Sequence, residues 1–522
     1  KNTTPMRKIL KWIFYFLMVV LVGLLIWVIY NNRDRHPGYD INLSIQQDAT
    51  NVQYQAGFAK KTITPSVPDT WNDTNGNARY DEGETYNDLN GNGKFDAVWI
   101  AGFHNNKPAN GIHDEVWART MVLDDGNHRV ALVSIDAIGF MYSDVIDIRK
   151  ALPSELDIDY ALISSTHTHE SNDLIGIWGP GMLQSGVDPD HMKWLKDQVV
   201  ASIAEACNQL RPARFVFGQD LSGRDSILIR DTRRPIVKAT GIQVMQVLDA
   251  EVDTTLGSVV NWSNHPEALW SKNLLISSDY PHFIRESLEA GIVYQGDTIV
   301  SGLGGTSVFF TGVIGGLMAP HASMPVYDSI RQVELTEPSF DKARAIGEQI
   351  ARWSVAALED GDTIQDLQPL RIEAKSVTLP VKNPVFRIAS SIGLLKRGMT
   401  GWFKARSEVA GIRFGPATWL SIPGEIYPEI VYGGVEAPPG QDFQISPVEV
   451  PPLKDFMMGE FHYYLGLSND EIGYIIPKSQ WDNKKPWLYL DERETYGEVN
   501  SLGPETAPIL YEGLKEVLQK LK

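Results

Sequence analysis

The chain has 522 residues and a formal net charge of −18, with 43% hydrophobic and 10% aromatic residues. This composition supplies a large hydrophobic core, and the negative charge argues against broad electrostatic binding to nucleic acid. The single cysteine, Cys207, excludes an internal disulfide and a cysteine-rich zinc site, so any metal must bind to histidine, carboxylate, tyrosine or backbone oxygen.

The N-terminal region contains a predicted membrane anchor, residues 12–30, which has no charged residue and is long enough to cross a bilayer. Basic residues precede it and a mixed-charge flank follows. Residues 1–11 are therefore expected in the cytoplasm and the rest of the chain outside it, in the periplasm or the extracellular space. No small-residue cleavage pattern follows, which favours an uncleaved signal-anchor over a signal peptide. Residues 31–52 are predicted to form a polar stalk.

Residues 66–100 are predicted to be an insertion with two calcium loops. Oxygen-bearing side chains recur at alternate positions, the spacing with which a tight loop surrounds a hard cation. The predicted ligands are Asp73, Asn75, Asn77, Asp81 and Glu84 in the first loop and Asp88, Asn90, Asn92 and Asp96 in the second. However, Ala78 replaces the usual turn glycine of the first loop, Trp99 occupies position 12 of the second, and flanking helices are not indicated. The alternative is a Gly/Asn/Asp-rich turn without an ion.

From residue 53 to 522, short β-branched runs alternate with helical stretches, the pattern of an α/β fold of mixed sheets with flanking helices. Strands are predicted over residues 129–135, 160–165, 257–262, 306–310 and 417–422, and helices over 189–209, 280–290, 339–359 and 505–521. The proline-rich residues 437–453 predict a long loop. Residues 391–404 interleave apolar and basic side chains, which indicates either an amphipathic segment in lipid headgroups or a core helix with snorkelling lysines.

Polar side chains follow several predicted strands, and they include His167, His169, His265 and Glu425. In open α/β sheets, ligands bind beyond the carboxyl ends of the strands, so we expect these side chains to share one site. His167 and His169 can lie on the same face of an extended chain. Such a pair is as compatible with a hydrogen-bonding role as with metal ligation, and imidazole nitrogen suits zinc.

Segments spread from about residue 54 to 510 resemble the catalytic domain of the neutral ceramidase family, zinc amidases that cleave the N-acyl bond of ceramide. They are AGFAKKTITP (56–65), GIHDEVWARTMVLDDG (111–126), THTHES (166–171), NWSNHP (261–266), ISSD (276–279), IPGE (422–425), GYIIP (473–477) and YGEVNSLGP (496–504). The family also carries a C-terminal immunoglobulin-like domain, which we expect this chain to lack.

The resemblance implies a zinc site whose ligands are His167, His265, Glu425 and Tyr474. It places His169 beside the metal, where the ring would stabilise the developing oxyanion. Tyr496 matches a family tyrosine that helps to polarise the substrate carbonyl. An arginine of the family corresponds to Arg233, although Arg234 in the same DTRRP segment fits as well.

One departure concerns the family's catalytic serine, which lies in a Gly-Asp-Val-Ser-Pro type motif. The corresponding region here is TGVIGGLMAPH, residues 311–321, where Gly315 and Gly316 replace Gly-Asp, and Met318 or Ala319 replaces the serine. Neither side chain can attack a carbonyl or deliver a proton.

Two interpretations follow. In the favoured one, metal-activated water attacks the carbonyl and Glu170 or Asp279 carries the proton. The protein is then a membrane-anchored, zinc-dependent amidohydrolase that acts on a lipid or another N-acyl compound. In the other, the fold persists as a catalytically inactive binding or assembly module.

Overall fold

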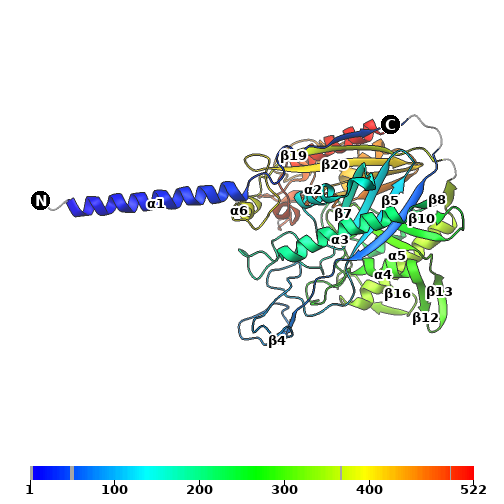
Figure 1. The fold of residues 1–522 in the computed structure, drawn as a ribbon, viewed down its shortest axis with the longest axis horizontal. Helices are drawn as coiled ribbons and strands as arrows, with labels where there is room; N and C mark the ends of the chain where they lie inside the picture. The colour runs from blue at the N-terminus through cyan, green and yellow to red at the C-terminus, as the bar shows by residue number, and fades with distance from the viewer. Residues whose placement is uncertain (1–3, 48–51, 365–366, 494) are drawn as a thin grey trace.

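The computed structural model describes residues 4–47, 52–364, 367–493 and 495–522. One apolar helix, α1 (Thr4–Asn31), projects from a domain that contains the remainder of the chain (Figure 1). Residues 7–31 of this helix are long and apolar enough to cross a membrane. Most of their side chains lie outside the domain, so this helix is a candidate membrane span.

The larger sheet carries the loops of the candidate site. Its strands are β2 (Gln55–Thr62), β5 (Trp117–Asp124), β6 (Arg129–Ile135), β7 (Tyr160–Ser165), β8 (Arg211–Asp220), β10 (Ile242–Asp249), β11 (Thr255–Trp262), β14 (Thr306–Thr311) and β18 (Asp362–Ile364). They lie in the order β14-β11-β10-β8-β2-β5-β6-β7, with β18 paired to β8. The β6–β7 and β11–β14 pairs are parallel. Because layers cover both faces, β6 and β7 are almost entirely buried, and their sequences do not alternate between apolar and charged residues.

The larger sheet curls until its two edges approach each other. The Ser134 hydroxyl on β6 donates a 2.6 Å hydrogen bond to the Phe309 carbonyl on β14. At the carboxyl ends of the edge strands, the Thr311 hydroxyl donates to the Thr166 carbonyl at 2.6 Å. Loops that follow the two opposite edges therefore meet.

The smaller sheet packs against the larger one. Its strands, in the order β1-β19-β20-β21-β23, are β1 (Asn42–Ile45), β19 (Arg371–Pro380), β20 (Lys404–Phe414), β21 (Ala417–Ser421) and β23 (Phe461–Leu465). Aromatic residues fill the core between the sheets: Trp419 stacks on Tyr463 with ring centroids 4.1 Å apart, and Phe217 lies 5.1 Å from Phe461. This buried apolar contact fixes the two sheets against each other.

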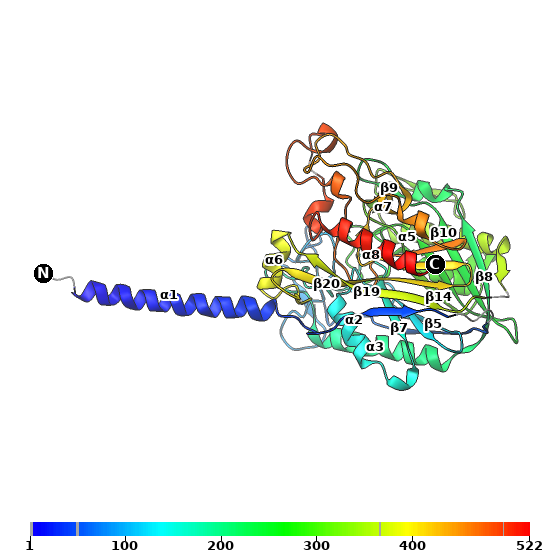
Figure 2. The ribbon, with the colours of Figure 1, turned by 90° about the horizontal axis from the view of Figure 1, so that it is seen from above.

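The domain also contains helices, some of which cover the outer faces of the sheets. They are α2 (Tyr142–Ala151), α3 (Pro189–Asn208), α4 (Tyr280–Ala290), α5 (Phe340–Glu359), α6 (Pro384–Ser391), α7 (Pro428–Tyr432) and α8 (Thr506–Lys520). Helices α3, α4 and α5 pack on the larger sheet and α8 packs on β19 and β20, which produces four layers (Figures 1 and 2). Helix α3 begins where the Asp188 carboxylate accepts from the Asp190 and His191 amides, with Pro189 at its first position.

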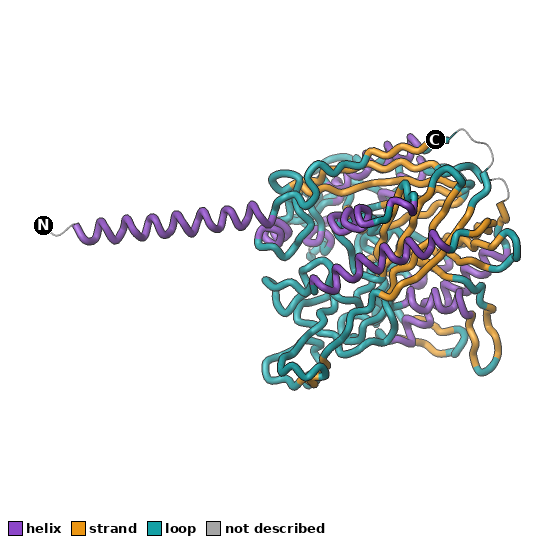
Figure 3. Tube along the Cα trace, viewed as in Figure 1, coloured by secondary structure: helices purple, strands orange, loops and turns teal. Residues whose placement is uncertain are grey.

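Short elements complete the fold, and loops gather on the side of the domain nearest α1 (Figure 3). The short strands are β3 (Asp69–Trp71), β4 (Tyr86–Asp88), β9 (Arg230–Asp231), β12 (Gly291–Tyr294), β13 (Asp297–Ser301), β15 (Leu317–Met318), β16 (Val326–Asp328), β17 (Val333–Leu335), β22 (Glu425–Ile426) and β24 (Tyr474–Ile475). Turns of 3₁₀-helix span Ser154–Leu156, Arg224–Leu228, Leu453–Phe456, Lys478–Gln480, Leu488–Leu490 and Gly497–Asn500.

The predicted α/β architecture of mixed sheets with flanking helices is confirmed. Each predicted strand and helix is present, with no end displaced by more than two residues. Residues 437–453 are irregular apart from the start of a 3₁₀ turn, as their proline content indicated.

The predicted polar stalk, residues 31–52, is wrong for its described part because that part packs on the domain. Residues 42–45 form β1, which pairs antiparallel with β19. Ile41 and Leu43 are half-buried and Ile45 is buried, an alternation typical of an edge strand. The sequence INLSI shows this alternation, but it extends over only five residues in a mainly polar segment. Residues 48–51 lie outside the described part of the chain.

Residues 391–404 do not form a core helix, which was one of the two predictions. Helix α6 ends at Ser391, and turns and bends follow it. Gly393 and Gly398 adopt φ values of 86° and 77°, which end helical structure. Within the segment Leu395 is buried, whereas Trp402 is 70% exposed.

Candidate functional site

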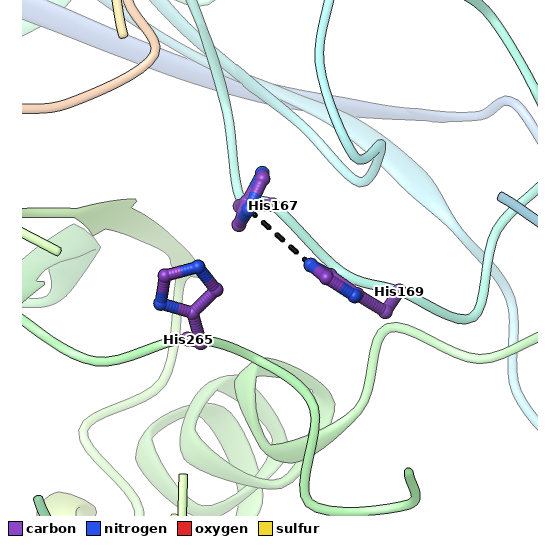
Figure 4. A group of neighbouring side chains, drawn as sticks. All are labelled: His167, His169 and His265. Atoms are coloured by element: carbon purple, nitrogen blue, oxygen red, sulfur yellow. Dashed lines mark hydrogen bonds between the residues drawn. The ribbon is translucent and has the colours of Figure 1, made fainter. Parts of the chain in front are cut away.

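Two loops bring three histidines together, one after the edge strand β7 and one after β11, which lies beside the opposite edge strand β14. His167 and His169 follow β7, and His265 follows β11 (Figure 4). The His167 ring centroid lies 4.8 Å from that of His169 and 4.8 Å from that of His265. One nitrogen from each ring lies within 4.8 Å of the others. The convergence expected from the sequence is therefore present for all three rings.

Glu425 and Tyr474 reach the same point from another pair of segments. They are directly paired in the short parallel bridge between β22 and β24. Glu425 Oε2 lies 3.0 Å from His265 Nε2 and 3.7 Å from His167 Nε2. Both Glu425 and Tyr474 are buried. The four predicted zinc ligands thus lie in one cluster.

Backbone carbonyls fix the orientation of the two ligand histidines. His167 Nδ1 lies 2.5 Å from the Ile138 carbonyl, and His265 Nδ1 lies 2.5 Å from the Leu317 carbonyl. Because a carbonyl oxygen only accepts, Nδ1 of each ring carries the proton and Nε2 points into the cluster. Outer partners of this kind orient metal-binding histidines in proteins. His167 has a φ of 67°, a left-handed conformation that the surrounding loop imposes.

The donor set fits a zinc ion. Nε2 of His167, Nε2 of His265 and the carboxylate of Glu425 are electron-pair donors that face one another, an arrangement suited to a bound cation. Burial lowers the pKa of His167 to about 4, which keeps the ring neutral and able to bind metal. Burial also opposes the charge on His265, but Glu425 outweighs burial and raises the pKa of His265. Nitrogen and oxygen donors in this combination are those that zinc binds.

His169 lies beside this cluster. Its Nε2 is 3.2 Å from His167 Nε2. Burial is the main cause that lowers the pKa of His169 well below its usual value, and the neighbouring histidines lower it further. The ring packs edge-on against Phe103 with centroids 5.2 Å apart. Gly102, with φ +94°, leaves no room for a side chain because a Cβ there would lie 2.8 Å from His169 Nδ1. His169 is thus held in one place as a neutral ring next to the cluster.

Tyr496 lies at the open side of the cluster. Its ring meets Tyr474 edge-on with centroids 5.8 Å apart, and the residue is 61% exposed. It lines the same cavity as His167 and His169, so its hydroxyl is available to a molecule bound there.

Arg233 does not line this cavity. Its guanidinium is buried, lies 2.9 Å from Glu498 and donates to the Gln480 carbonyl. It lines a separate hollow with Arg234, and Tyr496 lines both spaces. Arg234 is exposed and pairs with Asp491. The contacts of Arg233 therefore tie the loop that carries Tyr496 to β9, and neither arginine reaches the histidines.

The segment that replaces the family's serine motif contributes backbone to the site. Leu317 and Met318 form β15, which pairs with β9, and the Leu317 carbonyl accepts from His265. Gly315 packs so closely on the chain at Ile426 that a Cβ there would lie 2.6 Å from its backbone. The segment thus supports His265, and neither Met318 nor Ala319 lines the cavity.

The two acids suggested from the sequence as proton carriers, Glu170 and Asp279, make structural contacts. Glu170 lies 3.3 Å from Lys107 and accepts from the Asn273 amide at 2.9 Å. Asp279 caps α4, accepting from the Tyr280 and Leu269 amides. Burial raises the pKa of Glu170 to about 8 and that of Asp279 to about 7. Neither residue lines the cavity.

The structure adds Glu471, which the sequence analysis did not identify. Glu471 lines the cavity near the histidines, and the Gly473 amide donates to its Oε1 at 2.7 Å. Its Oε2 is buried and has no hydrogen-bond partner among the described residues. Burial raises the pKa of Glu471 well above its usual value. The only signal in the sequence is an acidic pair, Asp470 and Glu471, shortly before the GYIIP segment.

Apolar side chains form the rest of the cavity wall. They include Met141, Ile175, Trp178, Phe386, Leu395 and Met399. Arg397, in the same wall, is buried and pairs with Asp470 at 2.6 Å. An apolar space that ends at a few polar groups is typical of a site for a small or amphiphilic molecule.

The predicted calcium ligands converge within each of their two loops. In the first loop, the Asn75 and Asn77 amides each donate to Asp81 at 2.7 Å. The second loop repeats this contact, because Asn90 and Asn92 both donate to Asp96. Glu84 accepts from the backbone amides of Thr74 and Asp81, and Asp73 and Asp88 accept from backbone amides of their own loops. Oxygen donors close together in a tight loop fit a hard cation such as calcium.

Comparisons with known proteins bear on the fold. No protein-family model matches the chain, and no curated protein matches its sequence. The crystal structure of neutral ceramidase from Pseudomonas aeruginosa matches with a TM-score of 0.62 and 15% sequence identity, covering 90% of this chain and 75% of that chain. A ceramidase structure described as complexed with C2 matches with a TM-score of 0.61, 15% identity and the same coverage.

At this identity, the likeness is one of fold. The domain has the fold of the neutral ceramidase structures, and the resemblance noted in the sequence is confirmed at that level.

Proposed function

We propose that the protein is a membrane-anchored, zinc-dependent hydrolase of an amide bond in a lipid or another N-acyl compound. The observation that supports this most is the convergence of the His167, His265 and Glu425 electron pairs at the end of an apolar cavity. The ceramidases that share the fold cleave an amide in a lipid, which suggests the substrate class. The apolar wall would hold an acyl chain, and the polar end would meet the amide.

His167, His265, Glu425 and Tyr474 would hold the metal. When bound, zinc would polarise the substrate carbonyl and make a water molecule more acidic. Hydrolysis joins the water oxygen to the acyl carbon, breaks the C–N bond and transfers a proton to the departing nitrogen.

Residues of the cavity would assist these changes. The Tyr496 hydroxyl and His169 Nε2 would donate hydrogen bonds to the carbonyl oxygen as negative charge develops there. The unpartnered Oε2 of Glu471 would accept a proton from water and return it to the nitrogen. These roles take the place of those suggested for Glu170 and Asp279, which make structural contacts away from the cavity.

The second candidate is a catalytically inactive binding module. It is favoured by Met318 and Ala319, neither of which can replace the serine of the family motif. In this case the apolar cavity would hold an amphiphile without cleaving it.

One experiment separates the two candidates. The full chain is purified in detergent, its zinc content is measured by mass spectrometry, and it is assayed against N-acyl amides and esters of different chain lengths. About one zinc per chain with amide cleavage supports the hydrolase. Zinc-loaded protein that binds these compounds but cleaves none supports the module. A His128→Ala variant serves as a control, because His128 contacts Asp159 away from the cavity.

Two further features belong to this proposal. Helix α1 would anchor the protein as a single membrane span, with the basic N-terminal flank in the cytoplasm and the domain in the periplasm or extracellular space. The loops between residues 73 and 96 would bind calcium in a structural role, supported by the repeated side-chain arrangement in the two loops.

A further inference from the structure

Helix α6 lies beside the C-terminal end of α1. The Asn31 side chain, at the end of α1, donates to the Ser391 carbonyl at 2.9 Å, and the Asn32 side chain donates to the Ser391 hydroxyl at 3.1 Å. Figures 1 and 2 both show α6 beside the point where α1 enters the domain. These contacts tie the position of α6 to the end of the membrane span.

The two faces of α6 differ. Val385, Ile388 and Ile392 lie three or four residues apart, which places them on one side of a helix, and they are 63%, 59% and 36% exposed. Phe386 and Ser390, on another side, line the cavity that ends at the histidines. One side of this short helix thus lines the cavity, and another side presents an exposed apolar stripe.

Other residues next to this stripe are typical of a membrane–water interface. Trp402 is 70% exposed and packs against Phe403, whose ring lies 5.0 Å from the guanidinium of Arg387 on α6. At the end of α1, the Arg33 guanidinium lies over the Tyr30 ring at 3.8 Å and donates to the Tyr30 carbonyl. Tryptophan and tyrosine are enriched at the level of lipid headgroups, where basic side chains can reach the phosphates.

An exposed apolar stripe is unfavourable in water, at a cost that grows with its area. If α1 crosses the bilayer, its end at Asn31 lies at the membrane surface, and α6 lies within one hydrogen bond of that end. The stripe would then enter the boundary between headgroups and acyl chains, as an amphipathic interfacial helix does.

We infer that the outer face of α6, formed by Val385, Ile388 and Ile392, docks with Trp402 on the surface of the bilayer. The cavity behind α6 then opens at the membrane, and the amphiphile that it binds enters from the lipid phase. This inference rests on the proposed anchorage and on the proposed class of substrate.

The test places a fluorescent label at single positions of the full chain. Cys207 is replaced (C207S), and one new cysteine is introduced per variant: Ile388→Cys, Trp402→Cys, Leu21→Cys or Val293→Cys. Each protein is labelled with the environment-sensitive dye NBD and reconstituted into vesicles of phosphatidylcholine and phosphatidylglycerol, with or without spin-labelled lipid. Val293 is the matched control, because it is 62% exposed and belongs to the β12–β13 hairpin, at the end of the domain away from α1 (Figure 1).

We expect spin-labelled lipid to reduce NBD emission at positions 388 and 402 by about twofold or more and to leave position 293 unchanged. Quenching at position 21 without quenching at 388 and 402 would overturn the docking and leave the anchorage intact. The absence of quenching at position 21 would overturn both. A label at 388 that is shielded from aqueous iodide but not quenched by lipid would mean that protein covers this face, which would also overturn the docking. Zinc content and amide hydrolysis, measured in detergent, report separately on the proposed hydrolase.

Discussion

The two candidate ion sites of this protein are built in opposite ways. All the predicted calcium ligands lie between residues 73 and 96, at or near the surface, and their hydrogen bonds are mainly to neighbours in the same loop. The candidate zinc ligands extend from residue 167 to residue 474 and are buried. Backbone carbonyls of distant segments orient the two histidine ligands. A substitution in a calcium loop should therefore leave the rest of the domain unchanged, whereas the zinc site depends on the whole fold.

Removal of a zinc ligand should have the largest effect and should leave the calcium loops unchanged. In His265→Ala we expect zinc to fall to background and amide hydrolysis to fall by roughly 100-fold or more, since even outer partners of metal ligands cost 10–100-fold. Glu425→Gln tests the same point with a side chain of equal size. Mass spectrometry of the bound metal and circular dichroism separate loss of the ion from loss of the fold.

The contrast between the two sites would be wrong if a calcium-loop variant also lost zinc and amide hydrolysis. Asp88→Ala should leave zinc content and hydrolysis within about twofold of the unaltered chain, because among the described residues the Asp88 side chain bonds only to its own loop. Zinc retained in His265→Ala would show that His265 is not a ligand.

Loss of the Tyr496 hydroxyl should have the next largest effect. In Tyr496→Phe we expect kcat/KM to fall by about 100-fold, as when one donor to a developing oxyanion is removed. Zinc content should not change. Tyr489→Phe is the control, since the hydroxyl of Tyr489 contacts Glu436 outside the cavity. A change of less than about threefold in Tyr496→Phe would rule out this role.

Removal of calcium should loosen the calcium loops. With calcium at about 100 times its Kd, binding would stabilise the folded loops by about 2.7 kcal/mol. EGTA should therefore increase proteolytic cleavage between residues 73 and 96, and added calcium should reverse this. Cleavage sites are identified by mass spectrometry, and zinc is measured in the same samples. Unchanged cleavage in EGTA would contradict the calcium prediction.

The smallest expected effect concerns pH, because the pKa values of carboxyl groups in the two regions shift in opposite directions. Burial raises the pKa of Asp279 to about 7, whereas hydrogen bonds from Asn75 and Asn77 lower the pKa of Asp81. As pH rises from 3.8 to 7, the unfolded chain loses the Asp279 proton first, so the folded state loses stability. Asp81 acts in the other direction, and its contribution is lost as pH falls through its lowered pKa.

Asp279→Asn cannot titrate and keeps an oxygen for the cap of α4. It should reduce the loss of stability between pH 4 and pH 7, measured by chemical unfolding in detergent. Asp81→Asn should leave that part of the stability curve unchanged. Equal curves for Asp279→Asn and the unaltered chain would show that Asp279 is ionised in the folded state.

Much of the architecture could be predicted because it depends on local patterns. The β-branched run at 129–135 and the capped helix beginning at Pro189 carry their own signals, and both elements have the predicted bounds within two residues. Residues 31–52 show the limit of this reasoning. The composition indicated a stalk, but unpaired backbone groups on the edge of β19 accept β1 as an additional strand.

The candidate site could be predicted in part. The resemblance identified His167, His265, Glu425 and Tyr474, which the structure brings together. It also suggested Arg233, whose guanidinium forms an ion pair with Glu498. Glu471 was missed because nothing in a short acidic turn shows that one oxygen will face a cavity. Spacing along the chain carries no information about which carboxylate a distant arginine will pair with.

The sequence by itself determined the apolar helix α1, the strands and helices, and the spacing of the candidate calcium ligands. Each of these depends on hydrophobic periodicity or on residues within a few positions of one another. Only the tertiary structure decided that the larger sheet curls until Thr166 and Thr311 meet, that carbonyls of Ile138 and Leu317 turn two imidazoles inward, and that α6 lies beside the end of α1. These contacts join segments far apart in the chain, and they form only when the two sheets bury their shared core.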